Sequence, residues 1–453
     1  MKRRTFIKQG AWAAAALCSR SYMKSGQGKA TLKKRPRPTP QQLKWQDMEL
    51  GMFFHFDIPI YKPGWSWRSW KDIPAPDMYD PKKLNTDQWM EAAKAMGAQY
   101  AVFVAKHCSG FLQWQSDLYP YGVKQSPWRG GKGDVVKDFV ESCRKYHIKP
   151  GLYASVTANS YFEVDNPGLV NRGQGGDPEK QAQYAEMCEQ MLTELWSRYG
   201  ALFEIWFDGG ALPPEEGGPD LVPIYRKYQP DALVFQGPAA SIRWIGNERG
   251  TAPYPCWATV PHKNDCNGPG DPNGPFWLPA ECDVPVRDHD WFWKPNSTHK
   301  LYSLESLVDM YYCSVGRNCN LLLNANPNPD GLIPEPDFKR YGEFGKYIRN
   351  KFSDPIARTK GAGHSIELEI KKPEIIDHIV IMEDIKEGER IREYRVEGLM
   401  GPEKWEILVR GQSVGHKRIQ KFPPIEVSKV RLIISSAAGK PLIRNLEVYG
   451  LGQ

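Results

Sequence analysis

The sequence has little of what marks several large classes of protein. Its nine cysteines show no Cys-x-x-Cys spacing and are too sparse for a fold built on disulfides. Histidine pairs with zinc-site spacing, such as His-x-His or His-Glu-x-x-His, do not occur. Serine chemistry is not indicated at Ser109-Gly110, because a cysteine precedes this pair and no serine elbow is completed there. We therefore expect neither a metal nor a cofactor.

A long hydrophobic run is also missing. No stretch beyond the N-terminus has the roughly 18 uncharged apolar residues that a transmembrane helix needs, so we expect no membrane span. The net charge of +7 is misleading, because residues 1–40 hold 11 Lys and Arg and no Asp or Glu. The rest of the chain has 49 basic and 53 acidic residues. Such a mildly acidic body does not favour nucleic acid as a partner.

The basic N-terminus has the order of an export signal. Lys2, Arg3, Arg4 and Lys8 precede the short apolar run 11–17. We expect residues 1–23 to be an export signal and residues 24–41 a flexible lead-in, which predicts a periplasmic or extracellular protein. The twin-arginine route and ordinary secretion both fit. Lipid anchoring at Cys18 is a less favoured alternative, because Leu17 stands where lipoprotein signals have a small residue.

From Gln42 onward, segments of strand character alternate with segments of helix character. Strands are expected at 51–58, 100–107, 149–156 and 201–207, and helices at 86–96, 135–146 and 179–198. This alternation indicates βαβ units and a parallel sheet, and its length predicts a catalytic (β/α)8-type barrel over residues 42–352. Short β-rich runs follow, so residues 356–453 are predicted to form a C-terminal all-β sandwich.

The most informative segment is the apolar strand 201–207, which delivers Asp208 onto Gly209 and Gly210. Catalytic residues of such barrels lie at the C-terminal ends of the strands. His55 and His107 end two other expected strands, so the three polar residues predict one shared pocket. Taken singly, Asp208 could cap a turn and each histidine could be a structural hydrogen-bonding residue.

A second carboxylate is needed for glycosidic cleavage, which uses one ionised nucleophile and one protonated acid. Glu281 lies in the aromatic segment 276–283, where burial would raise its pKa and keep it protonated. Trp114, Trp206 and Trp293 offer aromatic faces to a sugar ring. Packing in the core is an equally good explanation for Trp206.

Several short motifs occur in the order typical of one enzyme family. They are Gly51–His55, Ala105–His107 with Gly110, Phe111 and Trp114, Ser126–Trp128, Gly131–Asp134, Gly151–Tyr153, Trp206–Gly209, Trp277–Asp283 and Asn320–Asn324. Through these motifs the chain resembles glycoside hydrolase family 29, the α-L-fucosidases, over essentially its whole ordered body. The segment 279–283 and the trailing β-domain resemble the branch that prefers α-1,3- and α-1,4-linked fucose.

The resemblance implies a mechanism and a set of site residues. Asp208 matches the nucleophile and Glu281 the general acid/base of a retaining hydrolase that acts on a fucosylated oligosaccharide or glycoconjugate. The other matches are substrate-binding residues, with Trp293 as an aromatic near the C5 methyl group: His55, His107, Trp114, Tyr153, Trp206 and Trp293. The oligomeric state stays open.

Two positions depart from the family pattern. Cys108 stands where a second histidine is usual, and a thiol is a poor substitute for an imidazole donor, at a cost of about 1–3 kcal/mol for a buried sugar hydroxyl. The segment Val286–Trp291 replaces the usual Pro-Gly before tryptophan. Either His289 substitutes for the usual second histidine, or the enzyme accepts a related sugar such as L-galactose. A catalytically silent carbohydrate-binding protein is a further alternative.

Overall fold

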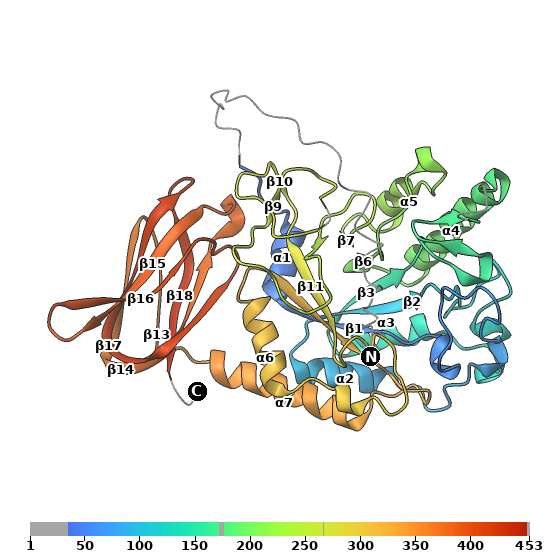
Figure 1. The fold of residues 1–453 in the computed structure, drawn as a ribbon, viewed down its shortest axis with the longest axis horizontal. Helices are drawn as coiled ribbons and strands as arrows, with labels where there is room; N and C mark the ends of the chain where they lie inside the picture. Colours follow the sequence, from blue (N-terminus) through green and yellow to red (C-terminus); the bar gives the residue numbers. More distant parts are fainter. Residues whose placement is uncertain (1–34, 172–175, 266, 451–453) are drawn as a thin grey trace, which may run out of the picture. The chain divides into compact units, whose positions relative to one another are not determined.

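The structure is a computed structural model that describes residues 35–171, 176–265 and 267–450 (Figure 1). The expected export signal and most of the expected lead-in lie outside the described residues. In the described ranges, no helix combines the length and the hydrophobicity that crossing a membrane requires.

Eight parallel strands form a nearly closed barrel in the order β7-β6-β3-β2-β1-β12-β11-β8. The strands are β1 (Leu50–Phe54), β2 (Tyr100–Lys106), β3 (Lys149–Ala154), β6 (Glu204–Trp206), β7 (Leu233–Phe235), β8 (Arg243–Trp244), β11 (Ala280–Pro285) and β12 (Asn320–Ala325). A parallel bridge between Phe235 and Ile242 brings the two ends of the sheet together. The predicted barrel is thereby confirmed.

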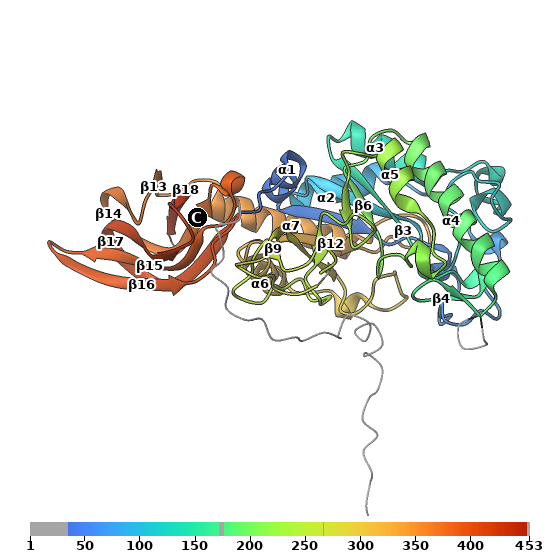
Figure 2. The same cartoon turned by 90° about the horizontal axis from the view of Figure 1, so that it is seen from above.

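Seven α-helices accompany the strands in the part of the chain that the structure describes (Figures 1 and 2). They are α1 (Pro40–Met48), α2 (Thr86–Met96), α3 (Val135–Lys145), α4 (Pro178–Arg198), α5 (Leu221–Tyr228), α6 (Leu304–Cys313) and α7 (Glu335–Phe352). The starts of α2, α3 and α4 are set by Asn85, Asp134 and Asp177, whose side chains accept hydrogen bonds from backbone N–H groups of the first turn. Two short antiparallel pairs, β4 (Val164–Asp165) with β5 (Leu169–Val170) and β9 (Thr259–Val260) with β10 (Phe276–Trp277), lie in the loops.

The strand β6 shows how the barrel is layered. Ile205 and Phe207 pack into the cluster that joins the sheet to its helices, whereas Trp206 belongs to the separate cluster inside the barrel. Since side chains alternate along a strand, Glu204, Trp206 and Asp208 form successive levels of the interior. Glu204 is the lowest level, and Asp208 follows the C-terminal end of the strand.

Helix α1 closes the N-terminal end of the barrel. The indole of Trp45 is fully buried, and its Nε1–H donates to Glu204 Oε2 over 3.1 Å. The Asn320 side-chain amide donates to the Trp45 carbonyl at 2.7 Å. Glu204 and its hydrogen-bond partners therefore form a polar floor, closed to solvent, at the N-terminal end of the barrel. We call the opposite end, where the strands finish and Asp208 lies, the mouth.

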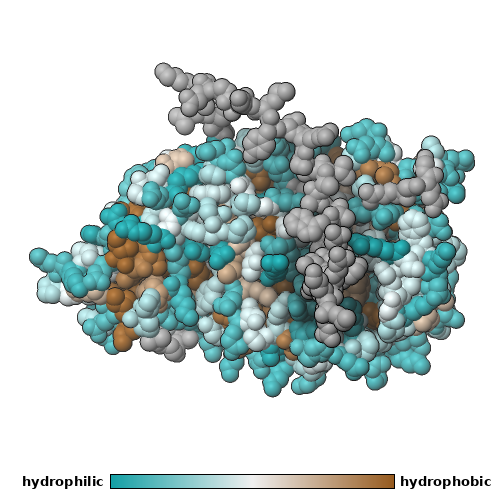
Figure 3. Space-filling view, in the orientation of Figure 1, coloured by the Kyte–Doolittle hydropathy of each residue, from teal (hydrophilic) through white to brown (hydrophobic). Residues whose placement is uncertain are grey.

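The C-terminal part is an antiparallel sheet in the order β13-β18-β14-β17-β15-β16. Its strands are β13 (Ala357–Ala362), β14 (Ser365–Glu383), β15 (Ile391–Met400), β16 (Lys404–Gly411), β17 (Arg418–Ala437) and β18 (Leu442–Gly450). The long strands β14 and β17 pair with each other through several register shifts, while β15 pairs with one end of β17 and β18 with the opposite end of β14. Side chains from both ends share one hydrophobic cluster, which confirms the predicted all-β domain. On the face shown in Figure 3, the broadest hydrophobic area lies over this domain.

A buried glutamate of the C-terminal domain joins it to the barrel. Both carboxylate oxygens of Glu389 accept from the Ala258 N–H at 3.0 Å, and the Asn318 side-chain amide also donates to Glu389. Only 3% of Glu389 is exposed. Because a buried carboxylate without partners is costly, these hydrogen bonds make the contact specific.

We expect Glu389→Ala to lower the free energy of unfolding by about 2–3 kcal/mol, because it leaves the buried Ala258 N–H without an acceptor and removes one of the two acceptors of the Asn318 amide. Chemical denaturation measures this loss. The matched control is Glu387→Ala, which removes only the partly exposed ion pairs of Glu387 with Arg37 and Arg390 and should cost less than about 1 kcal/mol. Equal effects of the two variants would contradict this account.

Candidate active site

Four polar side chains meet at the C-terminal end of the barrel. His55 follows β1, His107 follows β2, Tyr153 lies in β3 and Asp208 follows β6. The rings of His55 and His107 are 6.0 Å apart, and His107 stacks on Tyr153 at 5.7 Å. The Tyr153 hydroxyl donates to Asp208 Oδ2 over 3.1 Å. The structure thus brings together the strand ends that the sequence predicts to share a pocket.

Asp208 is held in place from two sides. Thr157 Oγ1 donates to its backbone carbonyl at 2.9 Å, and the following Gly209 and Gly210 have φ values of 70° and 84°, which glycine adopts without strain. Burial raises the pKa of Asp208, the hydrogen bond from Tyr153 lowers it, and the negative charge of Glu248 raises it again. The carboxylate is therefore oriented, and its charge is sensitive to a second carboxylate nearby.

Glu248 is that second carboxylate, and it is not among the site residues predicted from the sequence. It lies four residues after the short strand β8, is exposed, and accepts from Trp291 Nε1–H at 3.1 Å. The Trp291 ring is 4.9 Å from the ring of His55, which ties Glu248 to the mouth. Glu248 follows β8, the sixth barrel strand along the chain, which has only two residues, so no strand pattern in the sequence marks this position.

A network around Asn324 of β12 fixes the protonation of His55. The Asn324 Nδ2 group donates to the Trp291 carbonyl at 2.8 Å and to Asn326 Oδ1 at 3.2 Å, so its Oδ1 faces His55 Nδ1 at 2.7 Å. His55 Nδ1 must then carry the hydrogen, and Nε2 keeps its lone pair. Burial lowers the pKa of His55 to about 3, so the ring is neutral and can accept from a sugar hydroxyl.

A pocket of about 450 Å³ adjoins His107. Its walls are mostly aromatic and proline side chains from the loop after β1 and the loop after β11, among them Trp65, Trp67, Phe292 and Trp293. Phe292 packs 4.9 Å from His107 and 5.2 Å from His55. The mouth is thus polar on the side of Asp208 and apolar on the side of Trp293.

The segment 286–291, which departs from the family pattern, does not place a histidine where it could replace the one usual at position 108. His289 is 79% exposed, and its Nε2 lies 3.5 Å from Asp288 Oδ1. Asp290 instead anchors the segment through ion pairs with Lys294 at 2.5 Å and Lys300 at 3.0 Å. The alternative that His289 substitutes for the histidine usual at position 108 therefore finds no support.

The structure places Glu281 in the barrel floor, which corrects its assignment as acid/base. It is fully buried near the start of β11, four residues and about 13 Å of strand before the C-terminal end at Pro285. Its carboxyl accepts from Tyr100 Oη–H at 2.6 Å and from Trp206 Nε1–H at 3.1 Å. Burial raises its pKa to about 7 and that of neighbouring Glu204 well above the usual range. No sugar at the mouth can reach this carboxyl.

Trp114 and Trp206 also face away from a sugar at the mouth. Trp114 is fully buried and donates from Nε1 to Glu194 of α4 at 2.8 Å, so it packs between the barrel and that helix. Trp206 is 6% exposed and stacks on Phe235 at 4.1 Å and on Tyr153 at 5.5 Å. The assignment of Trp114 to the substrate is corrected, and Trp206 supports Tyr153 from below.

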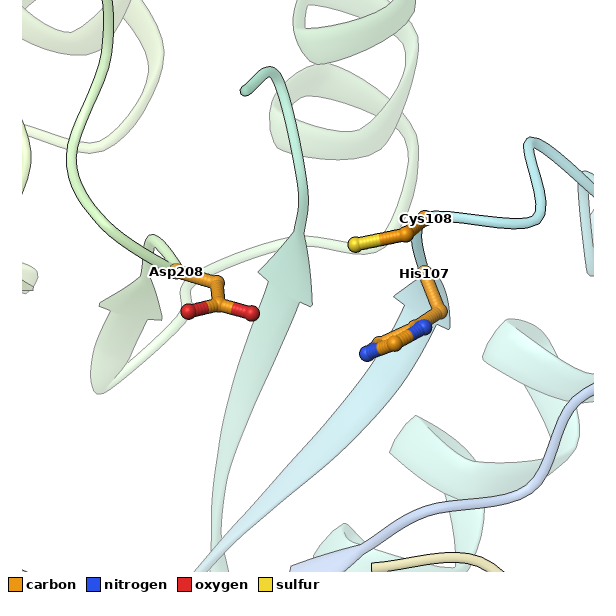
Figure 4. Close-up of side chains that lie close together, drawn as sticks. All are labelled: His107, Cys108 and Asp208. Atoms are coloured by element: carbon orange, nitrogen blue, oxygen red, sulfur yellow. The ribbon is translucent and has the colours of Figure 1, made fainter. Parts of the chain in front are cut away.

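Cys108 belongs to the mouth, although only 4% of it is exposed. Its Sγ lies 3.8 Å from Ser155 Oγ, and burial raises the pKa of the thiol to about 12. Donor atoms of His107, Cys108 and Asp208 all lie within 4.8 Å of one another (Figure 4). Cys108, which departs from the family pattern, therefore lies next to Asp208, the candidate nucleophile.

This geometry agrees with the comparison to known proteins. The family model described as Alpha-L-fucosidase matches residues 18–351. The chain belongs to the α-L-fucosidase family. This family consists of hydrolases that act on glycosides, so this fucosidase is a glycoside hydrolase.

Relatives extend the match beyond the barrel. Alpha-L-fucosidase 1 of Arabidopsis thaliana is 32% identical to this fucosidase, over 91% of this chain and 87% of its own. A putative α-L-fucosidase of Bacteroides thetaiotaomicron has a crystal structure with a TM-score of 0.87 and 42% identity, covering 92% of this chain and 100% of its own. A Ruminococcus gnavus GH29 fucosidase in complex with fucose, at 22% identity, a TM-score of 0.79 and coverage of 94% and 97%, shares the fold.

We expect Glu281→Gln to keep most of the turnover, because this side chain lies in the floor. The folded protein favours the protonated Glu281, so its contribution to stability is present below pH 4.5 and is lost as pH rises toward about 7. The amide does not titrate, so thermal unfolding of Glu281→Gln should vary less with pH across this window. A loss of activity by several orders of magnitude in a folded variant would contradict the floor assignment.

We also expect Asn324→Ala to lower kcat/KM by about tenfold or more, because His55 loses the acceptor that fixes its tautomer. The matched variant Asn324→Asp keeps the acceptor but adds a charge, which raises the pKa of His55 and shifts the acid limb of the pH profile upward. Nitrogen NMR of the His55 ring reports the tautomer directly. An unchanged tautomer in Asn324→Ala would refute the role of Asn324.

Proposed function

We propose that this fucosidase is a retaining enzyme with Asp208 as nucleophile and Glu248 as general acid/base. The supporting observation is that Tyr153 orients Asp208 through a hydrogen bond and that the negative charge of Glu248, at the same mouth, raises the pKa of Asp208. Asp208 attacks the anomeric carbon while Glu248 protonates the leaving oxygen, and Glu248 then deprotonates the water that releases fucose.

The two carboxyl groups alternate in their roles during this cycle. Glu248 gives a proton to the leaving oxygen in the first step and takes one from water in the second, and Asp208 is esterified by the sugar between the two steps. The exposed position of Glu248 also leaves it open to the leaving group and to water.

The proposed hydrogen-bond partners of the sugar hydroxyl groups are His55, His107 and Tyr153. Trp206 stacks beneath Tyr153 and supports it. Neutral His55 offers Nε2 as an acceptor, and the wall that includes Phe292 and Trp293 offers an apolar surface to the C5 substituent. Fucose has a methyl group there, whereas L-galactose has a hydroxymethyl group that would lose hydrogen bonds against this wall. We therefore favour L-fucose.

A related or substituted sugar is the second candidate, and Cys108 is the observation that favours it. A buried thiol, beside His107 and Asp208, offers a sugar hydroxyl a weaker hydrogen bond than an imidazole does. The weaker hydrogen bond relaxes the selection for one particular hydroxyl group. A panel of nitrophenyl α-L-glycosides compares the two candidates, since each predicts a different best substrate.

The linkage and the location are also proposed. The segment 279–283 and the β-domain resemble the branch that prefers α-1,3- and α-1,4-linked fucose, and we propose this preference here. The basic and apolar order of residues 2–17 supports export to the periplasm or the exterior. Because Glu281 lies in the floor and does not contact the substrate, the loops around the mouth must determine which glycosidic linkage is accepted.

We expect Asp208→Asn to abolish hydrolysis of both 4-nitrophenyl α-L-fucoside and a fucosylated Lewis-type trisaccharide. Glu248→Gln should lose about 100-fold or more on the trisaccharide, whose leaving oxygen needs a proton, and less in the first step on the nitrophenyl substrate. With the nitrophenyl substrate, azide should restore turnover of Glu248→Gln and yield a fucosyl azide of retained configuration.

Glu281→Gln is the matched control, since it removes a buried carboxyl of the same barrel. If Glu281→Gln loses the trisaccharide activity while Glu248→Gln keeps it, the proposed acid/base is wrong. If neither substrate is cleaved by the wild type while another α-L-glycoside is, the second candidate replaces the first.

A further inference from the structure

Three different metal-binding side chains converge at the mouth of the barrel. His107 and Cys108 follow β2, and Asp208 reaches toward them across the end of β3 (Figure 4). One ligand atom from each lies within 4.8 Å of the other two. Imidazole nitrogen, thiolate sulfur and carboxylate oxygen are the three donor types that zinc uses in proteins.

The three donors have spare capacity to bind an ion. Neither ring nitrogen of His107 has a hydrogen-bond partner among the described residues, and the ring is held by stacking on Tyr153. Cys108 makes one long contact, to Ser155 Oγ at 3.8 Å, and the described hydrogen bond to the Asp208 carboxylate engages Oδ2 alone. An ion would therefore displace few existing interactions.

The charges of the set also suit a divalent cation. The imidazole of His107 offers a nitrogen lone pair and adds no negative charge. Asp208 contributes one negative charge, and Cys108 contributes a second once its proton is lost, so the two together balance a dication. Donors around tetrahedral zinc are roughly 3.3–3.7 Å apart, so closing from 4.8 Å needs side-chain shifts of about 1 Å.

We propose that His107, Cys108 and Asp208 form a reversible inhibitory site for a thiophilic divalent cation, with Zn²⁺ as the preferred ion. On binding, the Cys108 S–H bond breaks, a sulfur–zinc bond forms, and the proton leaves to the solvent without any change of oxidation state. Water fills the open fourth position. The ion ligates the oxygen with which Asp208 would attack the sugar, so bound zinc and catalysis exclude each other.

Cys108 determines which ions this site selects. Thiolate favours zinc and disfavours Mg²⁺ and Ca²⁺, which prefer six or more oxygen ligands. The inhibition rests on the proposed role of Asp208, but the binding of zinc does not. Metal binding and hydrolysis can therefore fail independently.

The test uses the full-length protein and the metal alone. Calorimetric titration with ZnCl₂ near neutral pH should give one site per chain, and CoCl₂ should produce a near-ultraviolet absorption band from charge transfer between sulfur and cobalt. Cys108→Ser should abolish the band and weaken zinc binding by more than about 100-fold, since loss of even an outer partner costs about 10–100-fold. MgCl₂ should produce neither signal.

Two matched variants exclude other thiols. Cys313→Ser removes a partly exposed thiol at the end of α6, and Cys319→Ser removes a buried thiol whose Sγ lies 3.5 Å from that of Cys256. Both should bind zinc and cobalt as the wild type does. The proposal is overturned if the wild type binds no stoichiometric zinc, if Cys108→Ser binds like the wild type, or if the band disappears in Cys319→Ser.

Discussion

Hydrogen bonds to the buried carboxyl groups of Glu204 and Glu281 hold the aromatic column on which the mouth of the barrel rests. From the closed end Trp45 donates to Glu204 and Tyr100 donates to Glu281, and Trp206 donates to Glu281 from above. The Trp206 ring then stacks against Tyr153, whose hydroxyl orients Asp208. Two carboxyl groups this close cannot both ionise at low cost, so the floor favours a protonated state and a single arrangement. The position of the Asp208 carboxylate therefore depends on side chains at the opposite end of the barrel.

A second set of hydrogen bonds, made by Asn324 of β12 and by the nearby Asn326, holds the loop 286–295 beside the site. Asn324 connects His55 to the backbone of Trp291, and Asn326 donates to the carbonyls of Asp290 and Trp291. Trp291 in turn donates to Glu248. One amide network therefore sets the hydrogen position on His55, the course of the loop 286–295 and the placement of the exposed carboxylate. A change in this loop alters sugar contacts and acid/base position together.

The sequence predicts the fold and one of the two carboxylates that we propose as the catalytic pair, and the reasons differ by residue. Long apolar strands make the alternation of β and α visible, and Asp208 ends such a strand, so its place at the mouth could be anticipated. Glu281 could not be placed in the same way, because an aromatic setting surrounds the floor as well as the mouth, and only the register shows that β11 begins near this residue. Glu248 was missed because β8 has two residues and leaves no strand pattern to read. Trp114 follows β2 closely, yet its ring turns outward to α4, a direction that spacing alone does not determine.

The contrast between the two proposed catalytic carboxylates follows from what each must do. The nucleophile must meet one carbon atom within a few tenths of an ångström, which suits Asp208, fixed by Tyr153, Thr157 and a strand end. The acid/base must serve leaving groups of different size and then admit water, which suits Glu248 on an exposed loop with a single hydrogen bond from Trp291. The same openness leaves the mouth accessible to cations, and the Cys108 thiolate would be a softer ligand for them than an imidazole. If zinc binds there, the substitution at position 108 couples the activity of this fucosidase to the metal content of its surroundings.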